Sequence, residues 1–143
     1  MSSKQVVKAS KPVVKTTQTG AVAVHSSSSC DHGDSHAVVL FNLKVMVTKE
    51  EGYWFAQCLE IDYFVDGQTK DDVKKRFEEG LSDTIDLHLK EYGSLEKLLR
   101  PAPSRVLMDF NRKFTRLYSQ VSTHFHEHKA TIEFYEGQEE EAA

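Results

Sequence analysis

Hydrophobic and polar side chains alternate along the middle of the chain. Between Val39 and Val47 every second position is apolar, the period that sends neighbouring side chains to opposite faces of a strand. A charged turn ending at Gly52 follows, and the alternation resumes from Tyr53 to Ile61. This spacing predicts an antiparallel hairpin. Its second strand is expected to place Trp54, Ala56 and Cys58 on one face and Tyr53, Phe55, Gln57 and Leu59 on the other.

A short third strand and a long helix are predicted next. Residues 63–65 are apolar, and Asp66 with Gly67 supplies a turn after them. Thr69 is a good helix N-cap, and Gly93 is placed to end the helix in a left-handed conformation. Apolar or aromatic side chains recur between them at spacings of three and four, which predicts one helix face packed on a sheet. That stripe is Val73, Phe77, Leu81, Ile85, His88 and Tyr92.

The chain after this helix gives weaker signals. Ser94 is expected to cap a second short helix that Pro101 and Pro103 stop. The alternation of Val106, Met108 and Phe110 predicts a fourth strand, and residues up to Phe134 predict one or two further strands without a fixed register. The predicted fold class is therefore α+β, a small antiparallel sheet with one long helix packed on it, in the order β-β-β-α-β with a C-terminal β extension.

Length and composition favour one domain with polar ends. The 143 residues are 39% hydrophobic, enough for a single core. Residues 1–37 are rich in Ser, Thr and Lys and are expected to be disordered. The domain is expected over residues 38–136, and residues 137–143 form an acidic tail.

Charge and cysteine content narrow the class of protein. The net charge is −4, whereas nucleic-acid binders usually carry a basic excess. Cys30 and Cys58 form neither a disulfide framework nor a metal motif, which indicates a reducing compartment. No apolar run is long enough to span a bilayer, so we expect a cytoplasmic protein.

The order of motifs from Gly52 onward resembles the HicB family of antitoxins and their stand-alone relatives. The resemblance rests on a Gly-Tyr-aromatic start, an Ala-x-Cys-Leu-Glu segment, a Gly-x-Thr turn and an acidic residue opening a long helix. It covers about residues 39–99 of this chain. The matching positions are Gly52, Tyr53, Ala56, Cys58, Leu59, Glu60, Gly67, Thr69 and Asp72.

What the resemblance implies is a role without catalysis. Proteins of this family bind a small ribonuclease toxin with the sheet-and-helix domain, and most repress their own operon through a C-terminal DNA-binding segment. After Pro103 this chain shows no pair of capped helices and no basic recognition helix, so we do not expect DNA binding. We expect no enzyme activity and no cofactor, a homodimer that covers exposed sheet edges, and a partner such as a small basic ribonuclease toxin.

The expected partner contact comprises Tyr53, Trp54, Glu60 and Asp62. Its two acids would attract a basic partner during encounter. Three alternative sites remain open, each with a specific chemistry. They are a metal site, a nuclease site and an RNA-binding face.

In an extended strand, His124, His126 and His128 would share one face and offer three imidazoles to zinc, but we favour a solvated histidine-rich surface loop. Glu60, Asp62 and Asp66 would be the ligands of a magnesium-dependent nuclease if they converged in space.

Five aromatic residues in one small sheet would stack on RNA bases if cations surrounded them. They are Tyr53, Trp54, Phe55, Tyr63 and Phe64. The acids nearby count against RNA and favour a protein partner.

Overall fold

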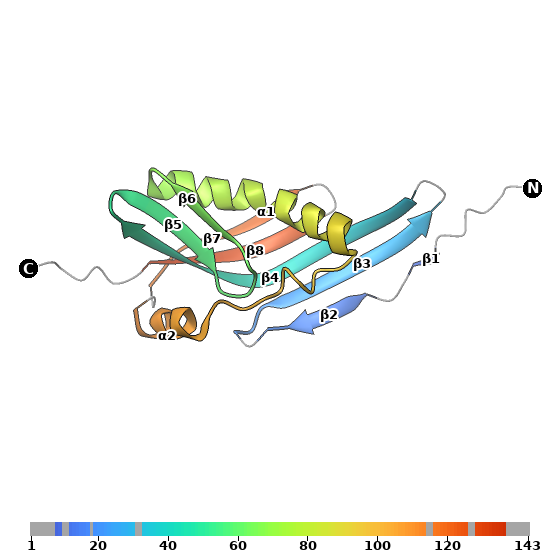
Figure 1. The fold of residues 1–143 in the computed structure, drawn as a ribbon, viewed down its shortest axis with the longest axis horizontal. Helices are drawn as coiled ribbons and strands as arrows, with labels where there is room; N and C mark the ends of the chain where they lie inside the picture. Colours follow the sequence, from blue (N-terminus) through green and yellow to red (C-terminus); the bar gives the residue numbers. More distant parts are fainter. Residues whose placement is uncertain are drawn as a thin grey trace, which may run out of the picture.

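The computed structural model describes residues 8–9, 12–17, 19–30, 33–113, 116–125 and 128–136. These residues form an α+β fold in which all the strands belong to one mostly antiparallel sheet accompanied by two helices, which confirms the predicted fold class at this level (Figure 1). None of the described helices is long and apolar enough to cross a bilayer. The elements are β1 (Lys8–Ala9), β2 (Val13–Thr16), β3 (Val22–Cys30), β4 (Gly33–Glu50), β5 (Tyr53–Cys58), β6 (Phe64–Gly67), α1 (Lys70–Tyr92), α2 (Ser104–Lys113), β7 (Arg116–Phe125) and β8 (His128–Glu136).

The long strand β4 organises the sheet. Its first half, up to Phe41, pairs with β3, and its second half, from Val45, pairs with β5, both antiparallel. Strand β8 pairs with β4 from Val39 to Val47 and therefore overlaps both partners. Since a strand has only two edges, β3 and β5 must follow each other along one edge while β8 occupies the other.

A break in the side-chain alternation of β4 occurs at Asn42. The register with β8 shifts between Leu40 and Leu43, and Asn42 has a φ of 62°, a left-handed conformation that Asn tolerates better than most residues. The core face therefore changes phase at this bulge. It uses Val38 and Leu40 before it and Leu43, Val45 and Val47 after it, whereas Phe41 is 42% exposed.

The first four elements of the predicted β-β-β-α-β order correspond to β4, β5, β6 and α1, but helix α2 takes the place of the predicted fourth strand. Strand β8 returns parallel to β4, as the crossover through a helix allows. The chain adds α2 and β7 before it reaches β8, and β7 then pairs with β8 as an antiparallel hairpin. The C-terminal β extension is thus the hairpin of β7 and β8.

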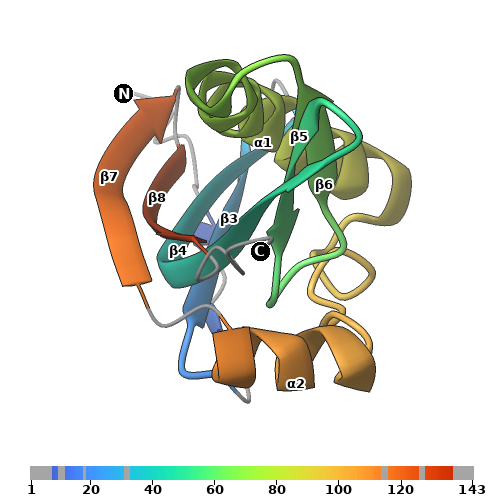
Figure 2. The ribbon, with the colours of Figure 1, turned by 90° about the vertical axis from the view of Figure 1, so that its left-hand side faces the viewer.

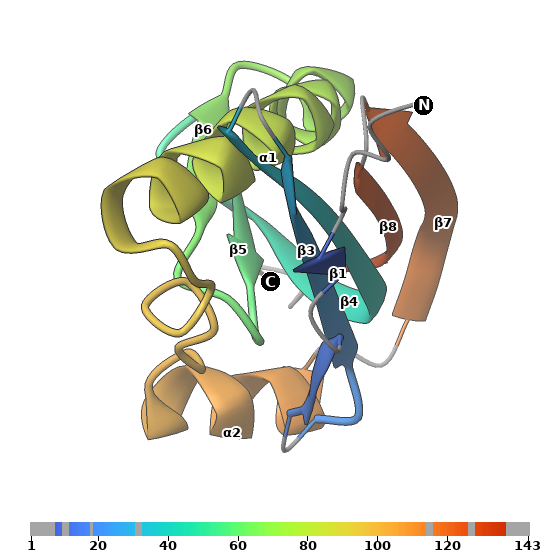
Figure 3. The same cartoon turned by 90° about the vertical axis from the view of Figure 1, so that its right-hand side faces the viewer.

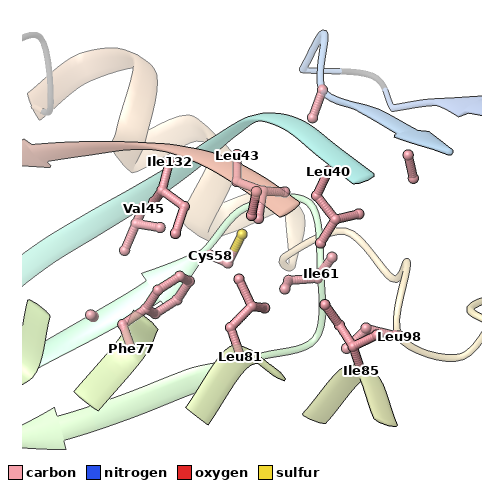
Figure 4. Packing of buried hydrophobic residues seen from close by; sticks show 14 of the residues in the cluster. Leu40, Leu43, Val45, Cys58, Ile61, Phe77, Leu81, Ile85, Leu98 and Ile132 are labelled. Carbon is pink, nitrogen blue, oxygen red and sulfur yellow. The ribbon is translucent and has the colours of Figure 1, made fainter. Parts of the chain in front are cut away.

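Helix α1 begins and ends at the residues that the sequence predicts. The Thr69 side chain accepts a hydrogen bond from the Asp72 N–H, and Gly93 has a φ of 68° with its N–H bonded to the Leu89 carbonyl. The first part of the predicted stripe is buried, but Leu89 replaces Tyr92 at its end, since Tyr92 is 51% exposed. Figure 4 shows Phe77, Leu81 and Ile85 of α1 packed with side chains of β4, β5 and β8.

The structure corrects the prediction for the chain after Gly93. Residues 94–100 form turns instead of a helix, and Ser104–Lys113 forms helix α2 instead of a strand. The apolar residues fit a helix because Val106, Leu107 and Phe110 share one side and pack against the opposite sheet face from α1, whereas Met108 is 60% exposed. Figure 3 shows the two helices on opposite sides of the sheet.

Most of the segment predicted to be disordered forms strands. Strand β3 pairs with β4 along its whole length, and β1 and β2 pair with the outer edge of β3. Backbone hydrogen bonds between strands hold these N-terminal strands on the sheet. Ala21 and Ala23 are small enough to enter the core. The prediction of disorder over residues 1–37 is therefore wrong for their described part. The predicted acidic tail, 137–143, lies outside the described residues.

Candidate functional site

One area of the sheet presents aromatic side chains to solvent. On β5, Tyr53 and Phe55 point to the face opposite α1, and Phe64 of β6 lies on the same face because it pairs with Gln57. We call Tyr53, Phe55 and Phe64 the outer patch. The rings of Phe55 and Phe64 stack with centroids 5.8 Å apart, yet Tyr53 is 55% and Phe64 57% exposed. Exposed aromatic side chains grouped on one face are typical of interaction surfaces.

The surroundings of the outer patch are acidic. Glu50 pairs with Tyr53 across the hairpin, and Asp66 pairs with Phe55. Both carboxylates are exposed, and the other paired positions hold Thr48 and Gln57. No Lys or Arg stands directly opposite an aromatic residue of this patch. A surface of this kind complements a basic partner and repels a phosphate backbone.

Helix α2 bounds the outer patch on the same sheet face. Its Val106, Leu107 and Phe110 pack with Met46, Leu59 and Tyr135, so this part of the face is closed. Phe110 and Tyr135 meet edge to face with ring centroids 5.1 Å apart. The outer patch is thus the exposed remainder of a face that α2 covers in part.

The four residues predicted to contact a partner do not form one surface. Tyr53 is in the outer patch and Asp62 is exposed in the loop after β5. Trp54 points to the α1 side and packs against the core, with the Lys49 ammonium 5.8 Å from its ring centroid. Glu60 is only 1% exposed, so its predicted contact with a partner is wrong for this structure.

Glu60 instead closes the junction where β3 and β5 meet along β4. Its carboxylate accepts hydrogen bonds from the Lys44 backbone N–H at 2.7 Å and from the Thr19 hydroxyl. The Cys58 thiol lies 3.7 Å from the same carboxylate, and the Lys44 ammonium donates to the Thr19 carbonyl. Burial raises the pKa of Glu60, while these hydrogen bonds act in the opposite direction. Glu60 is therefore a structural residue.

The described residues give no support to the alternative three-histidine metal site. His124 is exposed on β7, His126 lies outside the described residues, and His128 is on the next strand. The His128 Nδ1 accepts from the Val38 N–H at 3.0 Å, so Nε2 carries the proton and donates to Asp86 Oδ1 at 2.8 Å. Both His128 nitrogens are occupied. Among the described residues, no group of three or more His, Cys, Asp or Glu side chains is arranged to hold a metal ion.

The three carboxylates of the nuclease alternative are not grouped together. Glu60 is buried in its own hydrogen-bond network, whereas Asp62 and Asp66 are exposed. Within the described residues these carboxylates do not converge on a common point, so the structure gives no support to a magnesium site.

His25 and His36 form a pair that could not be foreseen from the sequence. His25 Nε2 of β3 and His36 Nδ1 of β4 lie 2.9 Å apart, with ring centroids separated by 5.1 Å. Burial lowers the pKa of His25, and the nearby His36 and His128 lower it further. The two histidines are 11 positions apart in the sequence, and this spacing gave no signal because the pairing depends on the unexpected β3–β4 hairpin.

The outer patch was recognisable in part from the sequence. Alternation along β5 placed Tyr53 and Phe55 on one face, and the structure confirms this. Phe64 could be added only after its register with Gln57 was known. Comparisons with known proteins add no assignment, because no protein-family model matches the chain and no curated protein or solved structure matches it at a significant level.

Proposed function

We propose that this chain is a cytoplasmic, non-catalytic HicB-like binding protein, an antitoxin or a protein derived from one. It masks a surface of a partner protein, such as a small basic ribonuclease toxin. The observation that carries the proposal is the outer patch, where exposed aromatic residues stand beside Glu50 and Asp66. Aromatic anchors supply most of the binding energy in many protein interfaces, and neighbouring acids favour encounter with a basic partner.

The order of elements gives further support. Strands β4, β5 and β6 and helix α1 come in the order expected from the resemblance, which covers about residues 39–99. The chain departs from that plan in α2 and in the hairpin of β7 and β8, and helix α2 uses its apolar side against the sheet. A recognition helix for DNA is therefore no part of the proposal.

The test compares an outer-patch variant with a matched control in co-purification from the native host. Phe64→Ala removes a 57% exposed ring from the patch, and Tyr92→Ala removes a 51% exposed ring from the end of α1. We expect wild type and Tyr92→Ala to retain the same basic protein in moderate salt. Phe64→Ala is expected to bind it about 30-fold more weakly, which is typical of an interface hot spot.

Two results would contradict the proposal. One is equal retention of the partner by both variants, which would place the contact elsewhere. The other is retention of RNA in place of protein, lost steeply as salt increases, which would favour the RNA-binding alternative. The predicted homodimer is a separate matter, checked by light scattering of the purified chain over a range of concentrations.

A further inference from the structure

Strand β7 has a long free edge. Within the described residues this ten-residue strand pairs only with β8, with one register shift between Leu117 and Ser119, and Figure 2 shows it at the outside of the sheet. Natural edge strands are usually short, or carry Lys or Pro, because an open edge pairs with other chains. The β6 edge is four residues long and contains Asp66, and the β2 edge is equally short and contains Lys15. Strand β7 has Arg116 at its start and an irregularity beside Tyr118, but its regular part, from Ser119 to Phe125, contains no Lys, Arg or Pro.

A groove runs between β7 and the flank of α1. It has a volume of about 330 Å³ and is lined by Lys75, Glu78, Glu79 and Ser82 of α1 and by Thr123 of β7. Thr123 pairs with the buried Ala130, so it belongs to the sheet face that α1 covers. The side chains of a strand added to the free edge of β7 would alternate between the two faces of the sheet, as those of β7 do. Every second side chain of the added strand would point to the side on which the groove lies.

The charges that line this groove are mainly acidic. Lys75 and Glu79 lie 3.9 Å apart and offset each other in part. Glu78 is half-buried and forms no ion pair with another described residue. Burial is the main cause of the raised pKa of Glu78. The nearby Lys74 acts to lower this pKa, and the nearby Glu79 acts to raise it. A cation placed in the groove would therefore stabilise the charged form of the Glu78 carboxylate, which has no ion-pair partner among the described residues.

We propose that the free edge of β7 and the adjoining groove bind an extended basic segment of another protein. The segment adds to β7 as a further strand through backbone hydrogen bonds. Its Lys or Arg side chains, at alternate positions, meet Glu78 and Glu79. A second copy of this chain fits less well, because symmetric pairing of two β7 strands brings the same acidic flanks towards each other. The inference does not depend on the outer patch.

The test uses two synthetic peptides and the full chain labelled with nitrogen-15. One peptide is acetyl-KTVTKTVTK, and its control, acetyl-ETVTETVTE, differs only in charge. We expect the lysine peptide to shift the amide resonances of β7 and to slow their hydrogen exchange, and the glutamate peptide to leave both unchanged. Affinity for the lysine peptide is expected to fall about two- to fivefold in Glu78→Gln and in Glu79→Gln.

Glu91→Gln is the matched control for these variants. Glu91 is also exposed on α1, but it lies in the last turn and does not line the groove. Its affinity for the lysine peptide should equal that of the wild type, and the spectra of all three variants verify that they fold. The inference is overturned by equal binding of both peptides, by no binding at millimolar concentration, or by shifts confined to β6 or β2. Shifts in β7 that depend on protein concentration without peptide would assign the edge to a second copy.

Discussion

Replacement of Glu60 provides a quantitative test of the sheet junction. In Glu60→Ala, the Lys44 N–H loses the acceptor that it reaches at 2.7 Å, and the Thr19 hydroxyl loses its carboxylate acceptor while it keeps the contact with the Thr17 hydroxyl. A buried donor without a partner costs about 1–3 kcal/mol, and an ordinary hydrogen bond contributes about 1 kcal/mol. The variant is therefore expected to lose about 2–4 kcal/mol of unfolding free energy.

Glu60→Gln should be much milder. The amide oxygen still accepts from the Lys44 N–H, and the amide nitrogen can donate to the Thr19 hydroxyl oxygen. The substitution also removes a charge whose burial is unfavourable, as the raised pKa of Glu60 indicates. We expect a loss of about 1 kcal/mol or less. Asp62→Ala, an exposed control two residues away, should stay within about 0.5 kcal/mol of the wild type.

The assay is urea unfolding followed by circular dichroism, in which an unchanged slope shows that the same surface is exposed in each variant. Equal losses in Glu60→Ala and Glu60→Gln would refute the proposed hydrogen-bond role. The pH dependence gives a second measure. Because the folded pKa of Glu60 is raised, the folded state binds the proton more strongly, and this contribution to stability falls as pH rises above about 4.5. Glu60→Gln should lack that decline.

Three further predictions concern the pair of His25 and His36, the buried Cys58 and the core residue Phe77. Since the pKa of His25 is lowered from 6.5, the unfolded state binds more protons, so unfolding free energy should rise with pH up to about 6.5; His25→Gln should flatten that rise in urea titrations. Burial raises the pKa of Cys58, so its thiol should react with an alkylating reagent only as fast as the protein unfolds. Mass spectrometry of a Cys30→Ser variant would measure this rate, and fast labelling would contradict the burial of Cys58. Phe77→Ala, which removes a fully buried ring, should cost about 3–5 kcal/mol in urea unfolding, and a loss below 1 kcal/mol would contradict this packing.

Local signals allowed part of the fold to be predicted from the sequence. The hairpin of β4 and β5 and the limits of α1 follow from alternation and from two capping residues, Thr69 and Gly93. Each depends on residues that are close in sequence. The phase change at Asn42 is different, because the bulge exists to fit β8, a strand about 90 residues away.

The N-terminal strands were unpredictable for a related reason. The serines of β3 carry no apolar pattern, and their strand exists through backbone pairing with the extension of β4. In α2, Val106 and Phe110 suit either a strand or a helix by spacing, and only packing against Met46 and Leu59 selects the helix. Tertiary contacts decided both cases.

In the candidate site, too, the features set by neighbouring residues were predicted and those set by distant residues were not. Tyr53 was correctly expected on an exposed face, whereas Glu60 was taken for a surface acid because its partners, Thr19 and Lys44, lie far away in the sequence. His128 was grouped with His124 by sequence spacing, but the turn between β7 and β8 separates them and Asp86 binds His128. Burial of a polar residue depends on such distant partners.

Native mass spectrometry of the untagged chain, purified from its host in moderate salt, tests the central claim most directly. We expect a complex of this chain with a small basic protein at equal stoichiometry, in which the exposed rings of Tyr53 and Phe64 become protected from oxidative footprinting. A chain found only alone, only with itself or only with nucleic acid would contradict the claim. So would a protein complex in which both rings stay as accessible as in the free chain.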